Sequence, residues 1–247
     1  MTQLDIKTED IVIKNGDLNI DGYLAMPTED GEFPAVIVVQ EIFGVNNHIK
    51  DVTRRFAKEG YVAIAPAIYQ RLDPGFETGY TPEAIEIGRK YKNQTKADEL
   101  LSDIQATIDY LYTLSQVKKT GVGTIGFCFG GHVVYLVATL PKIKATASFY
   151  GAGIANWKPG EEGKATVDCT PDIKGTLYAF FGKEDGSIPQ EQVDMIEKAL
   201  KDHNIPHKVF RYNGAEHGFF CDQRGSYNAE AAQDAWPKVL ELFKSEL

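Results

Sequence analysis

The chain has 247 residues, and its 26 basic and 35 acidic side chains give a formal net charge of −9. This length and a hydrophobic fraction of 43% are typical of a globular α/β protein, and we expect residues 1–247 to form a single domain with a substantial core. The acidic balance argues against a nucleic-acid partner, which would need a basic surface. No apolar run approaches the roughly 18 residues that a membrane-spanning helix needs, so we expect no membrane partner either.

The amino-terminal segment contains Asp5, Glu9 and Asp10 and has no basic stretch followed by an apolar one. We therefore expect neither a signal peptide nor a transit peptide, and we expect a cytoplasmic protein. The three cysteines are odd in number and far apart in the sequence. They predict neither a disulfide framework nor a C-x-x-C metal site.

Short apolar runs are spread along the whole chain. Within the first 25 residues, an Asn15-Gly16 turn signal between two such runs predicts a β-hairpin. The continuous run Ala35–Val39 is typical of a parallel strand buried on both faces. Further strands are expected at Tyr61–Ala65, Val122–Phe127, Ala145–Tyr150, Thr176–Phe181 and Lys208–Tyr212.

Segments with apolar residues at helical spacing separate these strands. The expected helices are Asn47–Lys58, Ala97–Ser115, Val133–Leu140, Gln190–Asn204 and Ala229–Leu247. This alternation predicts the α/β class, with a mostly parallel central sheet covered by helices on both faces. Tyr69–Arg89 and Ala152–Pro171 contain Pro and Gly, and we expect them to be loops over the carboxyl edge of the sheet, where ligands bind in such folds.

The segment GFCFGG at residues 126–131 follows a predicted strand and opens a predicted helix. A nucleophile elbow, G-x-nucleophile-x-G, requires this context, because the sharp turn projects its central residue out of the sheet. The glycines keep the neighbouring residues small, and the amide of Phe129 then points towards an anion site at the positive end of the helix. Cys128 is therefore the candidate nucleophile. The alternative is a buried cysteine in a structural glycine-rich turn.

A thiol nucleophile needs a base, and His217 is the best candidate because it lies between the last predicted strand and the last helix. The other four histidines are better explained by structural or solvent-facing positions: His48, His132, His203 and His207.

The base in turn needs an orienting acid. Asp185 follows the predicted strand Thr176–Phe181, although the neighbouring Glu184 could take its place. The order Cys128, Asp185, His217 matches the order of nucleophile, acid and histidine in α/β-hydrolases. Each of the three follows a separate predicted strand, so the sequence predicts a Cys-His-Asp triad at the carboxyl edge of the sheet.

Over nearly its whole length the chain resembles the dienelactone hydrolases (carboxymethylenebutenolidases), the cysteine-nucleophile branch of the α/β-hydrolase fold. The resemblance rests on five segments: QEIFGV at 40–45, GFCFGG at 126–131, FYG at 149–151, the turn at 185–189 and EHGF at 216–219.

This resemblance implies roles for further residues. Glu41 corresponds to a carboxylate beside the nucleophile, which in the family holds the resting thiol and exchanges partners when substrate arrives; a loop salt bridge is the alternative. The backbone amides of Ile42 and Phe129 would form the oxyanion hole. Arg71 matches an arginine that grips the substrate carboxylate, a task suited to a planar guanidinium, and Tyr150 is expected to contact the substrate.

The chain departs from the family pattern at one binding position. The second carboxylate-binding arginine of the family lies four residues after the catalytic histidine, where this chain has Cys221. Arg224 would reach inward in its place or would face solvent. The departure leaves the fold and the reaction class unchanged but leaves the substrate open.

The sequence thus predicts two-step covalent hydrolysis of a small lactone or carboxylic ester, with no metal or organic cofactor. One alternative is a carboxylesterase or thioesterase acting on another small acyl substrate, which Arg71→Ala would impair far less than a lactonase. A non-catalytic redox-sensing or binding protein is the alternative from another class. A peptidase is less favoured, because no added domain would admit a polypeptide. We expect a monomer or a small homo-oligomer.

Overall fold

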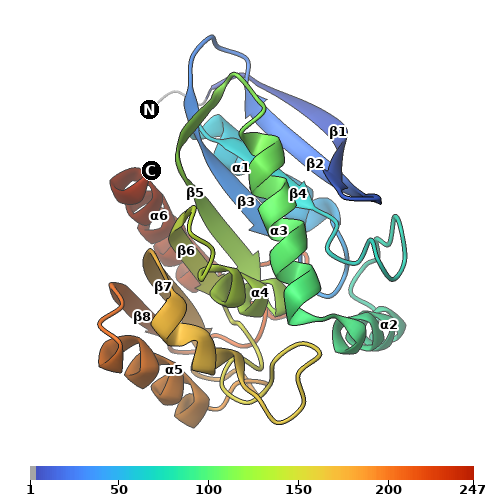
Figure 1. Cartoon of the computed structure of the whole chain (residues 1–247). Coiled ribbons are helices and arrows are strands. Elements are labelled where there is room, and N and C mark those ends of the chain that lie inside the picture. Colours follow the sequence, from blue (N-terminus) through green and yellow to red (C-terminus); the bar gives the residue numbers. More distant parts are fainter. Residues whose placement is uncertain (1–3) are drawn as a thin grey trace.

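The computed structural model describes residues 4–247, which are built around one eight-stranded sheet (Figure 1). Its strands are β1 (Ile6–Asn15), β2 (Leu18–Pro27), β3 (Phe33–Val39), β4 (Val62–Pro66), β5 (Val117–Phe127), β6 (Ile143–Phe149), β7 (Thr176–Gly182) and β8 (His207–Tyr212). The spatial order is β1-β2-β4-β3-β5-β6-β7-β8. The pairs β1–β2 and β2–β4 are antiparallel, and every later pair is parallel.

Six α-helices and one 3₁₀ segment, η1 (Thr166–Asp172), connect the strands. The helices are α1 (Asn47–Lys58), α2 (Pro82–Gln94), α3 (Ala97–Leu111), α4 (Phe129–Val137), α5 (Gln190–Asp202) and α6 (Ala229–Glu246). Figure 1 shows α3, α4 and α5 on one face of the sheet and α1 and α6 on the other. This arrangement confirms the predicted α/β-hydrolase fold. Within residues 4–247, no helix combines the length and apolar character needed to cross a membrane.

Strand β3 shows why the central strands are apolar throughout. Its side chains alternate between the two faces, as strand geometry requires. Ile37 and Val39 belong to the buried cluster that includes α3 and α4. Val36 and Val38 belong to the cluster that includes α1 and α6. Because helices cover both faces, neither set of side chains meets water, and the strand reads as a continuous hydrophobic run.

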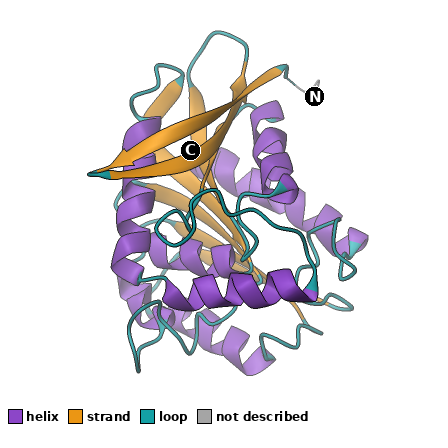
Figure 2. Ribbon diagram, turned by 90° about the vertical axis from the view of Figure 1, so that its right-hand side faces the viewer, coloured by secondary structure: helices purple, strands orange, loops and turns teal. Residues whose placement is uncertain are grey.

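The predicted amino-terminal hairpin is present as β1 and β2. Asn15 pairs with Leu18, so the loop consists of two residues, and Gly16 in it has a φ of 59°. Two-residue hairpin loops need such positive φ values, which glycine adopts without strain. Figure 2 shows the long hairpin crossing the other strands at a steep angle, as expected from sheet twist.

The prediction that Tyr69–Arg89 forms a loop is partly wrong, because this segment contains most of α2. The side chain of Thr81 accepts a hydrogen bond from the amide of Ala84, and Pro82 occupies the first helical turn. Both are established helix-start signals. The helix lacks the usual apolar stripe, since only Ala84 and Gly88 are buried in it and Ile87 is 44% exposed.

Candidate active site

The predicted catalytic residues follow the carboxyl ends of neighbouring parallel strands. Cys128 directly follows β5, Asp185 follows β7, and His217 follows β8. Glu41 follows β3, which pairs with β5. Because the carboxyl ends of parallel strands meet at one edge of a sheet, these side chains are gathered at a common rim.

The turn at Cys128 has the geometry of a nucleophile elbow. Cys128 has φ 55° and ψ −116° and directly precedes the first residue of α4. A Cβ on Gly126 would lie 2.1 Å from the carbonyl oxygen of Gly130, and a Cβ on Gly130 would lie 2.3 Å from that of Val39. Both glycines are therefore needed for the strand to turn directly into the helix.

Asp185 rather than Glu184 contacts the histidine. The Oδ2 atom of Asp185 lies 2.8 Å from Nδ1 of His217. Its Oδ1 atom accepts a hydrogen bond of 2.8 Å from the amide of Ser187, which fixes the carboxylate. Asp185 is 4% exposed, whereas Glu184 is exposed to solvent. Burial thus resolves the ambiguity left by the sequence.

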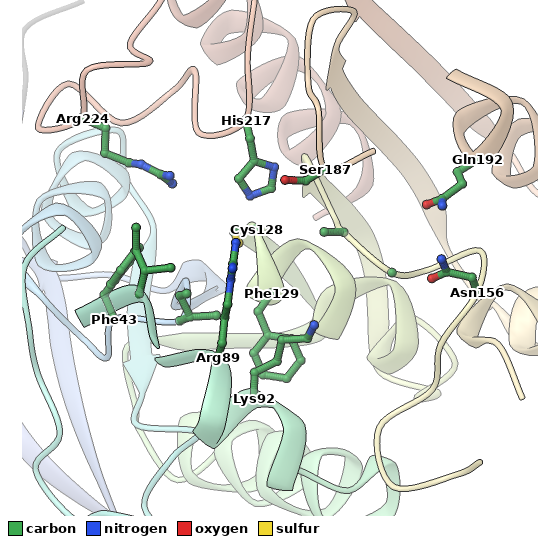
Figure 3. Close-up of a pocket in the computed structure, with 14 residues that line it drawn as sticks. Phe43, Arg89, Lys92, Cys128, Phe129, Asn156, Ser187, Gln192, His217 and Arg224 are labelled. Carbon is green, nitrogen blue, oxygen red and sulfur yellow. The ribbon is translucent and has the colours of Figure 1, made fainter. Parts of the chain in front are cut away.

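The imidazole of His217 also faces the thiol, since both side chains line one cavity. Figure 3 shows His217 pointing towards Cys128. Burial lowers the pKa of His217, but the charge of Cys128 and hydrogen bonds to Asp185 and Cys128 outweigh it and raise the pKa to about 10. The imidazolium form is therefore favoured at neutral pH, as a thiolate–imidazolium pair requires.

Cys128 and His217 open into a cavity of about 440 Å³ (Figure 3). Its lining comes from six parts of the chain: Ile42 and Phe43 after β3; Ile85, Arg89 and Lys92 on α2; Cys128 and Phe129 at the elbow; Ala152, Gly153 and Asn156 after β6; Ser187 and Gln192 after β7; and His217 and Arg224 after β8. The cavity is large enough for a small organic substrate.

Two backbone amides at this cavity are available to an oxyanion. Ile42 and Phe129 both line it, and within residues 4–247 neither amide donates a hydrogen bond. The Phe129 amide lies at the amino terminus of α4, where the helix dipole favours negative charge. The pair has the chemistry of an oxyanion hole.

The chain matches the Dienelactone hydrolase family over residues 20–247. The chain belongs to this family. A Synechocystis protein named "Putative carboxymethylenebutenolidase" is 63% identical over 244 residues, which cover 99% of both chains. The crystal structure of a "Putative Dienelactone Hydrolase" from Klebsiella pneumoniae superposes with a TM-score of 0.88 at 33% identity, covering 97% of this chain and 99% of that one.

A more distant relative from Bradyrhizobium is named "Probable 2-oxo-3-(5-oxofuran-2-ylidene)propanoate lactonase". It is 30% identical over 246 residues, which cover 97% of both chains. The predicted resemblance is thus confirmed, and this dienelactone hydrolase family member is a carboxymethylenebutenolidase-like hydrolase. The non-catalytic alternative is set aside by that result.

The cationic residues of α2 were missed in the sequence. Ile85, Arg89 and Lys92 follow a spacing of four and three residues, so one face of the helix supplies all three to the cavity. A Cβ on Gly88 would lie 2.2 Å from the carbonyl oxygen of Ile42, which shows how closely the helix packs on the oxyanion loop. The Thr81 cap was the signal that could have revealed this helix.

Arg71, which the resemblance assigned to the substrate carboxylate, is paired with another residue of the chain. Its Nη2 lies 2.6 Å and its Nε 3.0 Å from the carboxylate of Asp103, a residue of α3 that is only 3% exposed. The side chain is not part of the cavity lining. The guanidinium of Arg71 is therefore occupied by a bidentate ion pair with Asp103, and its position does not support the predicted contact with a substrate carboxylate. Arg89 and Lys92, which line the cavity, are better placed for that contact.

Tyr150 lies behind the catalytic histidine and not in the cavity wall. It is fully buried, and its ring centroid lies 5.2 Å from that of His217 in an edge-to-face arrangement. Burial raises the pKa of its hydroxyl far above the usual value. In this structure Tyr150 packs against His217 and is not placed to contact a substrate, contrary to expectation.

Arg224 reaches inward and lines the cavity. Its Nη1 lies 2.9 Å from Oε1 of Glu41, whose side chain is buried. Gly218 makes room for this arginine, since a Cβ there would lie 2.5 Å from Nη1 of Arg224. Of the two orientations left open by the sequence, the structure shows the inward one, with Glu41 as the partner of the guanidinium.

Proposed function

We propose that this protein hydrolyses a small lactone or carboxylic ester that carries a separate carboxylate, with Cys128 as nucleophile, His217 as acid–base and Asp185 as its orienting group. The main support is the position of His217, which pairs with Asp185 at 2.8 Å and lines the same cavity as Cys128. The names of the Bradyrhizobium and Synechocystis relatives favour a lactone over an open-chain ester.

In the first step, the Cys128 thiolate attacks the substrate carbonyl and forms a carbon–sulfur bond, while the carbonyl electrons move onto oxygen. The amides of Ile42 and Phe129 donate to this oxyanion, and each such donor is worth about 3 kcal/mol of transition-state stabilisation. The tetrahedral intermediate collapses, the carbon–oxygen ester bond breaks, and the leaving oxygen takes the proton of the His217 imidazolium. An acyl-cysteine remains.

In the second step, neutral His217 removes a proton from water as the water attacks the acyl-cysteine. The carbon–sulfur bond then breaks, the product acid leaves and gives its remaining proton to solvent, and the thiolate–imidazolium pair is restored. Asp185 accepts a hydrogen bond from Nδ1 of His217 throughout and stabilises the imidazolium.

The charge of the cavity supports an anionic substrate. Arg89, Lys92 and Arg224 line it, and its lining contains no acidic side chain. Glu41 offsets the charge of Arg224, so Arg89 and Lys92 leave the site positive. Burial lowers the pKa of Lys92, whose Nζ lies 4.6 Å from the ring centre of Trp157. A bound carboxylate would compensate this desolvation and stabilise the charged lysine.

Glu41 and Arg224 form the supporting pair in this proposal. When a substrate carboxylate approaches Arg224, it competes with Glu41 for the guanidinium. This exchange differs from the one that the resemblance implied, because here Glu41 is paired with Arg224, and not with the thiol, before substrate arrives.

The test compares Cys128→Ala and Cys128→Ser with the wild type on a carboxylate-bearing lactone and on a neutral aryl ester. We expect both variants to lose at least about 10³-fold in kcat, because an alcohol is poorly activated here and a methyl group is inert. Intact-mass measurement of the wild type should show one acyl group that disappears on turnover. Cys169→Ser is the matched control and should retain full activity.

Full turnover by Cys128→Ala would overturn the proposed mechanism. A kcat/KM for the neutral ester that equals or exceeds the value for the lactone would instead favour the carboxylesterase alternative.

A further inference from the structure

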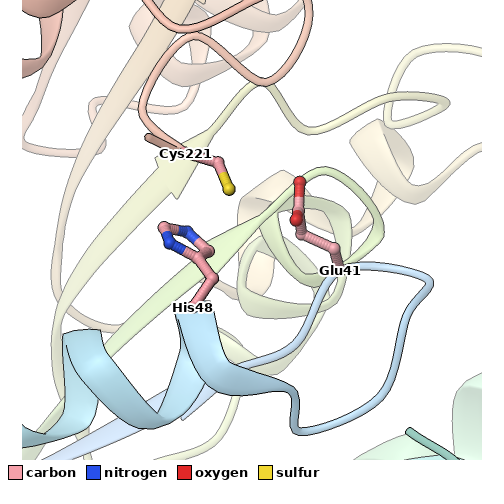
Figure 4. Close-up of side chains that lie close together, drawn as sticks. All are labelled: Glu41, His48 and Cys221. Carbon is pink, nitrogen blue, oxygen red and sulfur yellow. The ribbon is translucent and has the colours of Figure 1, made fainter. Parts of the chain in front are cut away.

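A second cluster of reactive side chains lies beside the triad. Glu41, His48 and Cys221 are all buried, and each offers one potential ligand atom within 4.8 Å of the other two (Figure 4). They come from three separate elements: the loop after β3, the first turn of α1 and the segment after His217. The proposed hydrolysis makes no use of His48 or Cys221.

Two polar atoms of this cluster lack a partner. In the part of the chain that the structure describes, Oε2 of Glu41 and Nε2 of His48 are buried and form no hydrogen bond. Glu41 is 0% and His48 2% exposed. Burying such atoms unsatisfied is unfavourable, so their position calls for a ligand between them.

Other polar atoms in and around the cluster have hydrogen-bond partners. Oε1 of Glu41 is occupied by Arg224. The Cys221 thiol donates to the hydroxyl of Tyr80 at 3.2 Å, and that hydroxyl also accepts from the amide of Asn46 at 3.1 Å. Burial lowers the pKa of His48, which keeps its imidazole neutral and able to coordinate.

We propose that Glu41, His48 and Cys221 form a binding site for a divalent transition metal ion of the Zn²⁺ class. One sulfur, one imidazole nitrogen and one carboxylate oxygen are a donor set that Zn²⁺ accepts, and three protein ligands leave a fourth position for water. In a tetrahedral Zn²⁺ site the ligand atoms lie about 3.5 Å apart, so ligand atoms now within 4.8 Å of one another need to close by no more than about 1.3 Å. The Cys221 thiol proton passes to solvent on binding; with the resulting thiolate, Glu41 and its partner Arg224, the occupied site carries one net positive charge.

His48 also connects the cluster with a second, acidic cavity. His48 also lines a cavity of about 220 Å³ whose wall includes Asp51 and Asp222. The guanidinium of Arg55 lies 4.0 Å from the ring centre of Trp236 in the same cavity. The two carboxylates offset this arginine and attract a divalent ion to the His48 side of the cluster.

Metal binding would link three segments around the active site. It would join the oxyanion loop at Glu41, the start of α1 and the segment that carries His217. Because the ion binds the folded arrangement and not the unfolded chain, it should raise the melting temperature.

The experiment uses the full chain with Cys128→Ser and Cys169→Ser, which leaves Cys221 as its only thiol. Cd²⁺ is titrated while thiolate-to-metal charge-transfer absorbance and heat are recorded. We expect one ion per chain and loss of the absorbance on adding Cys221→Ser. Adding His48→Gln should weaken binding at least about tenfold, whereas His203→Gln, at an exposed histidine, should not change it. Zn²⁺ should raise the melting temperature of the double variant but not of the Cys221→Ser triple variant.

Absence of the charge-transfer band in the double variant, or unchanged affinity in His48→Gln, would overturn the metal site. The double variant lacks the proposed nucleophile, so this outcome is independent of whether the hydrolytic mechanism holds.

Discussion

The triad rim and helix α2 form opposite sides of the same cavity, but they are held in different ways. Cys128, Asp185 and His217 follow strand ends, and hydrogen bonds restrain the side chains of Asp185 and His217. Helix α2 packs on the rim through Gly88 and presents the exposed Arg89 to the cavity. Under the proposed mechanism, reactivity depends on residues carried by the sheet, whereas substrate preference depends on a helix that covers it. Three predictions test this division.

The largest effect is expected at the rim, from Asp185→Asn. An amide cannot stabilise the imidazolium and turns His217 to the wrong tautomer, so kcat should fall about 10²- to 10⁴-fold on both substrates. Because Asp185 is one of the groups that raise the pKa of His217 to about 10, the alkaline limb of the kcat/KM profile should move to lower pH. Steady-state kinetics across pH measure both effects.

Glu184→Gln is the control for this change, since it removes the same charge from an exposed neighbour. Its kcat and pH profile should match the wild type. An equal loss in both variants would contradict the assignment of Asp185 as the orienting acid.

An intermediate effect is expected where the two regions meet, from Gly88→Ala. The added Cβ would collide with the carbonyl of Ile42, so α2 and the oxyanion loop must separate. We expect kcat/KM to fall about 10- to 100-fold on both substrates, together with a stability loss of about 1–3 kcal/mol in denaturant unfolding. Gly79→Ala, where a Cβ has open space, should change neither quantity. Unaltered kinetics in Gly88→Ala would show that α2 does not position the rim.

The smallest and most selective effect is expected from Arg89→Gln. Loss of the guanidinium should raise KM for the carboxylate-bearing lactone about tenfold, equal to about 1.4 kcal/mol, and leave the neutral ester unaffected. Arg71→Gln removes the same charge outside the cavity. It should spare both KM values and reduce stability through the loss of its Asp103 partner. If Arg71→Gln instead raised KM for the lactone, the substrate site would have to be reassigned.

The sequence was most informative where one short segment determines the geometry. The elbow could be predicted because two glycines and Cys128 occupy five consecutive positions, and the strand-to-helix turn follows from them locally. Choosing Asp185 over Glu184 required burial, which depends on the packed fold and not on the neighbouring residues.

Residues that act through tertiary placement could not be predicted. Arg71 matches a family arginine in the sequence, but in the structure it forms an ion pair with Asp103 of α3. Contact with Ile42 determines which face of α2 meets the cavity. Because Ile87 is apolar but exposed, the pattern of apolar residues does not identify that face in the sequence. Likewise, Glu41, His48 and Cys221 lie on three elements and share no motif.

The backbone of Cys128 has a wider consequence. A φ of 55° is unfavourable for any residue with a side chain, and such positions typically cost about 1–3 kcal/mol. Glycine would relieve that penalty but would remove the sulfur. The strain at Cys128 therefore lowers the free energy of unfolding of the protein. A descendant no longer selected for activity would become more stable by replacing Cys128, the proposed nucleophile, with glycine.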